Sequence, residues 1–188
     1  QSEELTWTRT NAHHAIADEC KSVQNDVGVI DISGSSKFMV SGKDANKFLN
    51  FLSCNKLPQK IGAIGLTLFH SHRGGIMTEQ SITKINDDTY YLVGPILSEN
   101  RDLDWMQSHA KHFKVKIENQ TETTSSLLVT GPKSRELLQK IMKDDLSNSS
   151  LPWLRSKKML VDSAQVRVMR VSYAGELGFE LHMPSYQL

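Results

Sequence analysis

Apolar positions recur along the chain with two different spacings, and each spacing predicts a different kind of element. Apolar residues at intervals of three and four predict helices, and alternation of apolar with polar residues predicts strands. Helices are expected at residues 12–27, 44–52, 98–113 and 131–141. Strands are expected at residues 29–32, 37–41, 66–70, 76–85, 90–93, 115–117, 127–130, 159–161, 166–171 and 179–182. This mixed order of helices and strands indicates an α+β fold.

A stretch from the first half of the chain returns in the second half. Residues 40–52, Val-Ser-Gly-Lys-Asp-Ala-Asn-Lys-Phe-Leu-Asn-Phe-Leu, align without a gap on residues 129–141, Val-Thr-Gly-Pro-Lys-Ser-Arg-Glu-Leu-Leu-Gln-Lys-Ile. The strong apolar positions coincide, and so do Gly42 and Gly131 at the start of each expected helix. The repeat predicts a pseudo-symmetric pair of β-α-β-β-type (ferredoxin-like) halves with antiparallel sheets, at about 29–120 and about 121–188. Halves related in this way would share a central cleft.

The second half ends in a sequence typical of a hairpin. Alternating residues on both sides of Gly175 and Gly178 predict two paired strands joined by a tight turn. Tyr173 precedes this turn and Glu180 follows it, so we expect the two side chains to lie close together. A phenol ring can pack against a flat polar heterocycle while a carboxylate accepts hydrogen bonds from its N–H groups. The alternative is an ordinary hairpin in which Glu180 faces solvent.

The first half contains a hairpin with the same glycine signal, around Gly74. When Gly74 is aligned on Gly175, Glu79 falls on Glu180. This alignment predicts one carboxylate in each half, at equivalent places after the two hairpins. Both carboxylates are therefore expected to be directed toward the shared cleft.

Composition narrows the class of protein. The 188 residues carry a formal net charge of +1 with scattered basic residues, so the basic patch typical of nucleic-acid binding is lacking. No apolar run approaches the ~20 residues that a membrane-spanning helix needs. The cysteines, Cys20 and Cys54, form no disulfide framework, and the first residues show no secretory signal. We expect a cytoplasmic protein, or a mitochondrial matrix protein in a eukaryotic cell, with neither nucleic acid nor membrane as a partner.

Other candidate sites lack a complete set of residues. His70 with His72, and His109 with His112, have spacings that could begin a metal site, but neither pair has an evident third ligand. No metal site is therefore predicted. The sequence Gly-x-Gly-x-x-Gly, which marks a dinucleotide-binding turn, is absent. Trp153 is expected to fill space in the core or between domains, as large aromatic residues mostly do.

Six segments carry a resemblance that covers almost the whole chain. In chain order they are Val27–Asp31, Lys37–Gly42, Arg73–Glu79, Leu103–Trp105, Val129–Pro132 and Arg170–Glu180. Together they resemble the folate-binding aminomethyltransferase family, which includes the T-protein of the glycine cleavage system and the homologous region of dimethylglycine and sarcosine dehydrogenases. The resemblance implies the aminomethyltransferase folate-binding fold. Because family members continue into further helices and a C-terminal domain, it also implies that residues 1–188 form a partial, truncated domain.

The resemblance assigns roles to four residues. Tyr173 and Glu180 would hold the pterin ring of tetrahydrofolate. Thr83 would belong to the same pocket, at a position where the T-protein often has an aromatic residue. Glu79 would be the catalytic carboxylate, placed near the folate nitrogens at which the one-carbon unit is transferred.

The catalytic position separates two branches of the family. The T-protein has paired aspartates where this chain has Thr78 and Glu79. The glutamate, together with Thr10–Asn11, Leu103–Trp105 and Pro152–Leu154, is more similar to the dehydrogenase branch. In that branch a flavin domain oxidises an N-methylated glycine, and the folate region captures the resulting iminium or formaldehyde as 5,10-methylenetetrahydrofolate.

The dehydrogenase branch implies an enzyme whose FAD lies on a separate domain that this chain does not contain. The implied partners are folate and either that flavin dehydrogenase domain or the remaining C-terminal domain, and residues 1–188 are expected to be inactive alone. Two alternatives stay open: a non-catalytic folate-binding regulatory or scaffold module of the same fold, and the aminomethyltransferase of glycine cleavage. Retention of Tyr173, Glu180 and a carboxylate at Glu79 favours an enzyme over a scaffold, because a decayed pocket would be expected to lose at least one of them.

Overall fold

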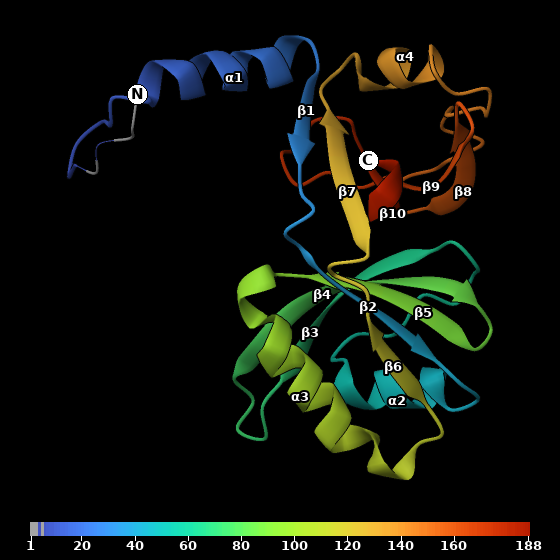
Figure 1. Cartoon of the computed structure of the whole chain (residues 1–188). Coiled ribbons are helices and arrows are strands. Elements are labelled where there is room, and N and C mark those ends of the chain that lie inside the picture. The colour runs from blue at the N-terminus through green and yellow to red at the C-terminus, as the bar shows by residue number, and fades with distance from the viewer. Residues whose placement is uncertain (1–3, 5) are drawn as a thin grey trace.

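The chain forms two five-stranded antiparallel sheets, one above the other in Figure 1. The computed structural model describes residue 4 and residues 6–188. The lower sheet has the order β3 (Ile64–His70), β4 (Ile76–Asn86), β5 (Thr89–Gly94), β2 (Ser36–Ser41), β6 (Lys116–Asn119). The upper sheet has the order β1 (Gly28–Asp31), β7 (Thr124–Thr130), β10 (Gly178–Pro184), β9 (Ala164–Met169), β8 (Ser156–Val161). The prediction of an α+β fold with antiparallel sheets is confirmed.

The helices of the described residues lie outside this pair of sheets. They are α1 (His13–Asn25), α2 (Ala45–Leu52), α3 (Glu99–His109) and α4 (Ser134–Gln139), with 3-10 turns at Ile96–Ser98, Ala110–His112 and Ser185–Gln187. Figure 1 shows α4 beyond the upper sheet, and α2 and α3 on the side of the lower sheet that faces away from it. Each sheet therefore has its own helix-covered core.

The two sheets repeat one topology. Along the chain, β2, α2, β3, β4 and β5 are matched by β7, α4, β8, β9 and β10, and the strands pair in the same order within each sheet. Gly42 and Gly131 occupy equivalent places between strand and helix, with φ angles of 126° and 123°. A Cβ atom at either glycine would lie 2.4 Å from a backbone oxygen, that of Lys114 or of Asp26. The repeat seen in the sequence is thus a repeat of structure.

The edge strands are exchanged between the two halves. β1 directly precedes β2 in the chain, yet it pairs with β7 of the upper sheet, where Val29 faces Val129. β6 directly precedes β7, yet it pairs with β2 of the lower sheet, where Ile117 faces Val40. The predicted first half of about 29–120 therefore begins with a strand that belongs to the other sheet.

The predicted alignment of the two hairpins is wrong. Gly74 lies in the turn between β3 and β4, whereas Gly175 lies in the connection between β9 and β10, residues 170–177. The counterpart of that connection is the short turn at Asp87–Asp88, between β4 and β5. A glycine indicates a turn in both segments, but it does not indicate which two strands the turn connects. The connection at residues 170–177 is also a loop rather than the tight turn that we expected.

Strand register gives Glu180 a different counterpart. β10 pairs with β7 as β5 pairs with β2, and Gly131 after β7 matches Gly42 after β2. In this frame Tyr91 of β5 occupies the place of Glu180. Glu79 lies one strand away, on β4. The two carboxylates therefore reach a common cleft without being symmetry equivalents.

Apolar side chains on the helices build the two cores. On α2 the buried residues are Ala45, Phe48, Leu49 and Leu52, which is the face predicted from their spacing. On the shorter α4, Leu138 is buried and belongs to the core of the upper sheet. A third, smaller cluster of buried residues joins the sheets, and it consists of Ile64, Tyr91 and Met169.

Backbone hydrogen bonds join the sheets along one seam, which we define as residues 62–64 with residues 154–156. Ile64 donates its N–H to the carbonyl of Leu154 over 3.0 Å, and Ser156 donates to Gly62 over 2.7 Å. Gly62 has a φ of 77°, and a Cβ atom there would lie 2.5 Å from the Ser156 oxygen. Glycine at this position therefore permits the close approach of the two chains.

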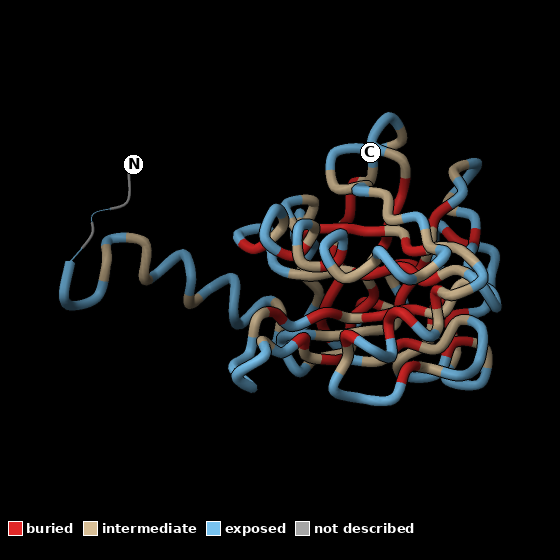
Figure 2. Tube along the Cα trace, turned by 90° about the horizontal axis from the view of Figure 1, so that it is seen from below, coloured by how far each residue is buried: buried red, intermediate tan, exposed pale blue. Residues whose placement is uncertain are grey.

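The first helix projects from the body of the protein. α1 begins at the predicted place, but none of its residues is buried, and Figure 2 shows it extending away from the two sheets. The apolar stripe that we expected, from Ala15 to Val23, is therefore not packed into a core. Among the described residues no helix is long and apolar enough to cross a membrane.

The equivalent glycines give a test of the repeat. Gly42→Ala or Gly131→Ala would force an L-residue into a left-handed conformation against a carbonyl oxygen, and we expect a loss of about 1–3 kcal/mol in the free energy of unfolding. Urea denaturation measures this loss. Gly34→Ala is the matched control, because a Cβ atom at Gly34 has nothing within 4 Å and its φ is not positive. Equal stability of all three variants would contradict the geometry.

Candidate functional site

A cavity of about 420 Å³ lies between the two sheets, beside the seam. The lower sheet contributes Glu79 and Ser81 of β4 with Val93 and Gly94 of β5. The upper half contributes Glu180 of β10, with Trp153, Leu154, Val171, Ser172 and Tyr173 from its loops. Three of the four residues predicted for the site therefore line one cavity: Glu79, Tyr173 and Glu180.

Glu79 presents a free carboxylate to the cavity. Its neighbours on β4, Thr78 and Gln80, are buried, and Glu79 itself is exposed, as expected from the alternation of a strand. Within the described part of the chain, its carboxylate has no hydrogen bond or ion pair. It is therefore available to a ligand or to a proton.

A buried polar network lies behind Glu79. Asp102 of α3 accepts hydrogen bonds from the side-chain amide of Gln80 over 3.0 Å and from the hydroxyl of Ser98 over 2.7 Å. The hydroxyl of Thr78 lies 3.3 Å from the Ser98 hydroxyl. These contacts tie the helix to both buried neighbours of Glu79. The network thus fixes the strand that presents the carboxylate.

Glu180 is held more tightly than Glu79. Its Oε2 lies 2.9 Å from Nε2 of His182, and Nδ1 of the same ring lies 3.1 Å from the hydroxyl of Tyr91. His182 is only 3% exposed, whereas its alternation with Leu181 in the sequence had suggested the opposite face from the core. Burial lowers the pKa of His182, and its hydrogen bond to Glu180 offsets part of that change. Burial also raises the pKa of the Tyr91 phenol.

Lys37 places a positive charge near Glu180. The side chain is fully buried, and its ammonium group donates to the carbonyls of Ser33 over 2.9 Å and Ser35 over 2.8 Å. Burial lowers the pKa of Lys37, while the nearby negative charge of Glu180 acts in the opposite direction. Lys37 therefore fixes the loop that carries Ser35 into the cavity wall.

Two aromatic residues lie at the opening of the cavity. Tyr173 belongs to the loop at residues 170–177 and is 98% exposed, and Trp153 is 53% exposed. We expected Trp153 to fill space in the core or between domains, and its place in the cavity wall is a correction. Both rings are free to pack against a flat ligand. The sequence predicted Tyr173 at this place from its position before Glu180, but it gave no signal for Trp153.

Thr83 is not brought to the cavity. It lies on β4 with no exposed surface, and its hydroxyl has no hydrogen-bond partner. It pairs with Ile64 on one side and Tyr91 on the other, in the cluster that joins the sheets. A polar residue on a strand at a sheet–sheet junction is buried whichever face it occupies, and the sequence did not show that junction.

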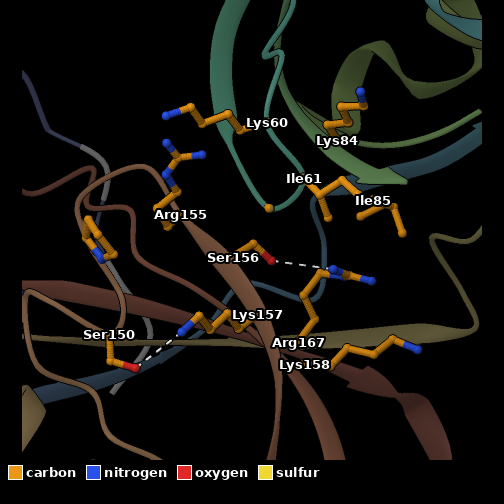
Figure 3. A pocket seen from close by; sticks show the side chains of 12 residues that line it. Lys60, Ile61, Lys84, Ile85, Ser150, Arg155, Ser156, Lys157, Lys158 and Arg167 are labelled. Carbon is orange, nitrogen blue, oxygen red and sulfur yellow. Dashed lines mark hydrogen bonds between the residues drawn. The ribbon is translucent and has the colours of Figure 1, made fainter. Parts of the chain in front are cut away.

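A second cavity, of about 630 Å³, shares no wall residue with the first. It lies between Lys60 and Lys84 on one side and β8 and β9 on the other (Figure 3). Its wall carries six cationic side chains and no carboxylate: Lys60, Lys84, Arg155, Lys157, Lys158 and Arg167. It contains none of the predicted site residues. Among the described residues, no group of three or more His, Cys, Asp or Glu is placed to hold a metal ion.

The two five-stranded sheets have the fold of an aminomethyltransferase domain. The chain belongs to the family described as the GCVT N-terminal domain, which it matches over residues 2–188. It is 33% identical over 179 residues to mitochondrial dimethylglycine dehydrogenase of Mus musculus, covering 94% of this chain and 20% of that protein. It is 32% identical over 180 residues to the aminomethyltransferase of Caldanaerobacter subterraneus subsp. tengcongensis, covering 95% of this chain and 48% of that protein.

Solved structures support the fold. The glycine cleavage system aminomethyltransferase T of Bartonella henselae aligns with a TM-score of 0.79 at 22% identity, over 89% of this chain and 44% of that chain. The heterotetrameric sarcosine oxidase of Corynebacterium sp. U-96, in complex with pyrrole 2-carboxylate, aligns with a TM-score of 0.67 at 16% identity, over 96% of this chain and 89% of that chain. The chain thus spans about a fifth of the dimethylglycine dehydrogenase and about half of the aminomethyltransferases that it resembles. The predicted family and fold are confirmed.

The buried network behind Glu79 gives a test of how the strand is held. Asp102→Ala would remove the carboxylate that accepts hydrogen bonds from the buried Gln80 amide and Ser98 hydroxyl. Among the described residues, the Ser98 hydroxyl would keep only its contacts with the Pro95 carbonyl and Thr78, and the Gln80 amide only a long contact with Thr78, so both would lose their charged acceptor. We expect a loss of about 1–3 kcal/mol in the free energy of unfolding, measured by urea denaturation. Asp104→Ala is the control, because Asp104 lies on the same helix but is exposed. A loss of the same size in both variants would show that the helix dipole, and not the network, is responsible.

Proposed function

We propose that this chain is the folate-binding part of an enzyme that captures a one-carbon unit as 5,10-methylenetetrahydrofolate. The unit would come from the oxidation of an N-methylated glycine, such as dimethylglycine or sarcosine, on a separate flavin domain. The observation that carries this proposal is the meeting of Glu79 and Glu180, from different sheets, in one cavity with Tyr173 at its opening. The chain is almost equally similar to dimethylglycine dehydrogenase and to an aminomethyltransferase, so the choice of branch depends on Glu79 and on the segments that resemble the dehydrogenase branch.

The cavity suits a pterin ring. Its volume of about 420 Å³ lies within the ~300–1,000 Å³ usual for small-molecule sites. Glu180 has one carboxylate oxygen bonded to His182, so the other can accept N–H groups from the ring. The exposed ring of Tyr173 can cover the flat face of the ligand.

Glu79 supplies the chemistry in this proposal. In the capture of formaldehyde, N5 and N10 of tetrahydrofolate each form a bond to the carbon and each lose a proton, and the carbonyl oxygen leaves as water. N10 loses its proton when the ring closes. A carboxylate within hydrogen-bond reach can accept that proton and stabilise the positive charge that develops. Glu79 has no partner among the described residues that would compete for this role. Glu180, already committed to His182, is suited to binding instead.

The side chain at position 78 does not distinguish the two branches chemically. Thr78 is buried, and its hydroxyl faces Ser98 rather than the cavity. An aspartate there would join the network around Asp102, on the opposite side of the strand from Glu79. The preference for the dehydrogenase branch therefore depends on Glu79 and on the segments that resemble that branch, not on the loss of an aspartate from the site.

Glu180→Gln tests the binding role. The amide would turn a donor toward the N–H groups of the pterin, so we expect tetrahydrofolate affinity to fall by about 1.5–3 kcal/mol, the range for hydrogen bonds to charged groups. Isothermal titration calorimetry measures the change. Glu176→Gln is the matched control, since it removes the same charge close by in the sequence but outside the cavity wall. Unchanged affinity in Glu180→Gln would remove Glu180 from the site.

Glu79→Gln tests the chemical role. The amide keeps the shape but cannot accept a proton, so we expect nearly normal tetrahydrofolate affinity and a rate of methylenetetrahydrofolate formation that is about 10²–10⁴-fold lower. The measurement is product formation from formaldehyde and saturating tetrahydrofolate in the full-length protein, because residues 1–188 are expected to be inactive alone. Loss of binding in this variant, with slow chemistry in Glu180→Gln even at saturation, would reverse the two roles. Tight binding without product in the wild type would identify a non-catalytic folate-binding module.

A further inference from the structure

Three buried or partly buried side chains form a continuous chain of hydrogen bonds that ends at the cavity. Tyr91 of β5 meets Nδ1 of His182, and Nε2 of His182 meets Glu180, which lines the cavity. The Tyr91 and His182 rings meet edge to face, with centroids 5.6 Å apart and an interplanar angle of 87°. Tyr91 comes from the lower sheet, and the other two residues come from β10 of the upper sheet. The chain of bonds therefore crosses the junction between the sheets.

The chemistry of the three groups determines which atom donates in each of the two hydrogen bonds. An ionised carboxylate only accepts hydrogen bonds, so Nε2 of His182 must donate to Glu180. A neutral imidazole has a single N–H, so its Nδ1 is then an acceptor and the Tyr91 hydroxyl must donate to it. The pKa changes agree with this assignment, because burial favours both the neutral imidazole and the protonated phenol.

We propose that His182 and Tyr91 are positioning residues that orient the Glu180 carboxylate for N–H recognition. With Oε2 bound to the imidazole, rotation of the carboxylate is restricted, and Oε1 is directed to the ligand. Tyr91 fixes the tautomer of His182, so the carboxylate meets a donor and never a bare nitrogen. This inference rests on the proposed function for the identity of the ligand, but the hydrogen-bond chain can be tested without it.

Burial is the main cause that lowers the pKa of His182 and so favours the neutral imidazole, and the charges around the ring modify this effect. The groups that face the ring are Glu180 on its own strand, Tyr91 on β5, Lys37 on β2 and Arg167 on β9. Lys37 and Arg167 both lower the pKa of His182, and Glu180 alone raises it. In the unfolded chain the histidine protonates near pH 6.5, so the folded state should lose stability as the pH falls below that value.

Tyr91→Phe is the first arm of the test, because it removes only the hydroxyl. We expect tetrahydrofolate to bind about three- to tenfold more weakly, as for the loss of one orienting hydrogen bond. The matched control is Tyr90→Phe. Tyr90 is equally buried on the same strand, but its hydroxyl accepts a hydrogen bond over 2.7 Å from Asn46, in the core of the lower sheet. A purely structural role for Tyr91 would lower stability in both variants and affinity in neither.

His182 is tested by a pair of substitutions. His182→Gln can keep a donor near Oε2 and should retain most of the affinity, whereas His182→Leu removes it and should bind about tenfold more weakly. Equal affinities in wild type, Tyr91→Phe and His182→Leu would overturn the proposal. If the wild-type protein fails to bind tetrahydrofolate, the proposed function is wrong. The hydrogen-bond chain from Tyr91 through His182 to Glu180 is then tested by an experiment that needs no ligand.

Nitrogen-15 NMR of labelled histidine is that experiment. We expect His182 to show a protonated Nε2 and a bare, hydrogen-bonded Nδ1, with no imidazolium signal at pH 6. Tyr91→Phe should remove the hydrogen-bond shift at Nδ1, and Glu180→Gln should relax the tautomer preference. A protonated Nδ1 in the wild type, or a His182 spectrum that neither substitution changes, would show that the proposed hydrogen-bond chain is wrong even if folate binds.

Discussion

The seam between residues 62–64 and 154–156 is the contact on which the candidate site depends. Each sheet has its own core and its own helices, so each could satisfy its apolar residues without the other. What holds Glu79 of one sheet opposite Glu180 of the other is a short set of backbone hydrogen bonds, with the small cluster of Ile64, Tyr91 and Met169 beside it. Because these hydrogen bonds hold the two segments at a fixed separation, they help to set the width of the cleft, together with the packing of the cluster.

The two carboxylates of the cleft have opposite degrees of constraint. Glu180 is bonded to a buried histidine and lies near a buried lysine, and such a group recognises a fixed pattern of donors. Glu79 stands on a rigid strand, held from behind by Asp102, yet its own oxygens are free. A free carboxylate can gain and lose a proton without breaking a structural bond. This difference in constraint does not follow from the residue type, which is the same at both positions.

The local sequence pattern predicted most helices and strands, but not which connections are equivalent in the two halves or where the two sheets meet. Helix and strand periods placed most elements close to their observed bounds, because burial of α2 and of the central strands follows the simple rule of one apolar face. The same rule failed for His182, which lies at the junction of two sheets where both faces of a strand are covered. Thr83, which the resemblance placed in the folate pocket, is buried at the same junction. The local pattern also failed to pair the hairpins correctly, since Gly74 and Gly175 give the same turn signal in different connections. The hairpin pattern pointed to Tyr173 and Glu180, and the family resemblance assigned roles to these two residues, to Glu79 and to Thr83, of which Thr83 does not line the cavity.

The exchange of edge strands has a consequence for folding during synthesis. β1 leaves the ribosome long before β7, the strand with which it pairs, and the whole lower sheet is made in between. An unpaired strand exposes its N–H and C=O groups and can associate with other chains. Contacts between residues so distant in sequence also form slowly, because a long loop must be closed first. The lower sheet can therefore be complete while β1 is still unpaired. During this interval the nascent chain would most need protection by a chaperone.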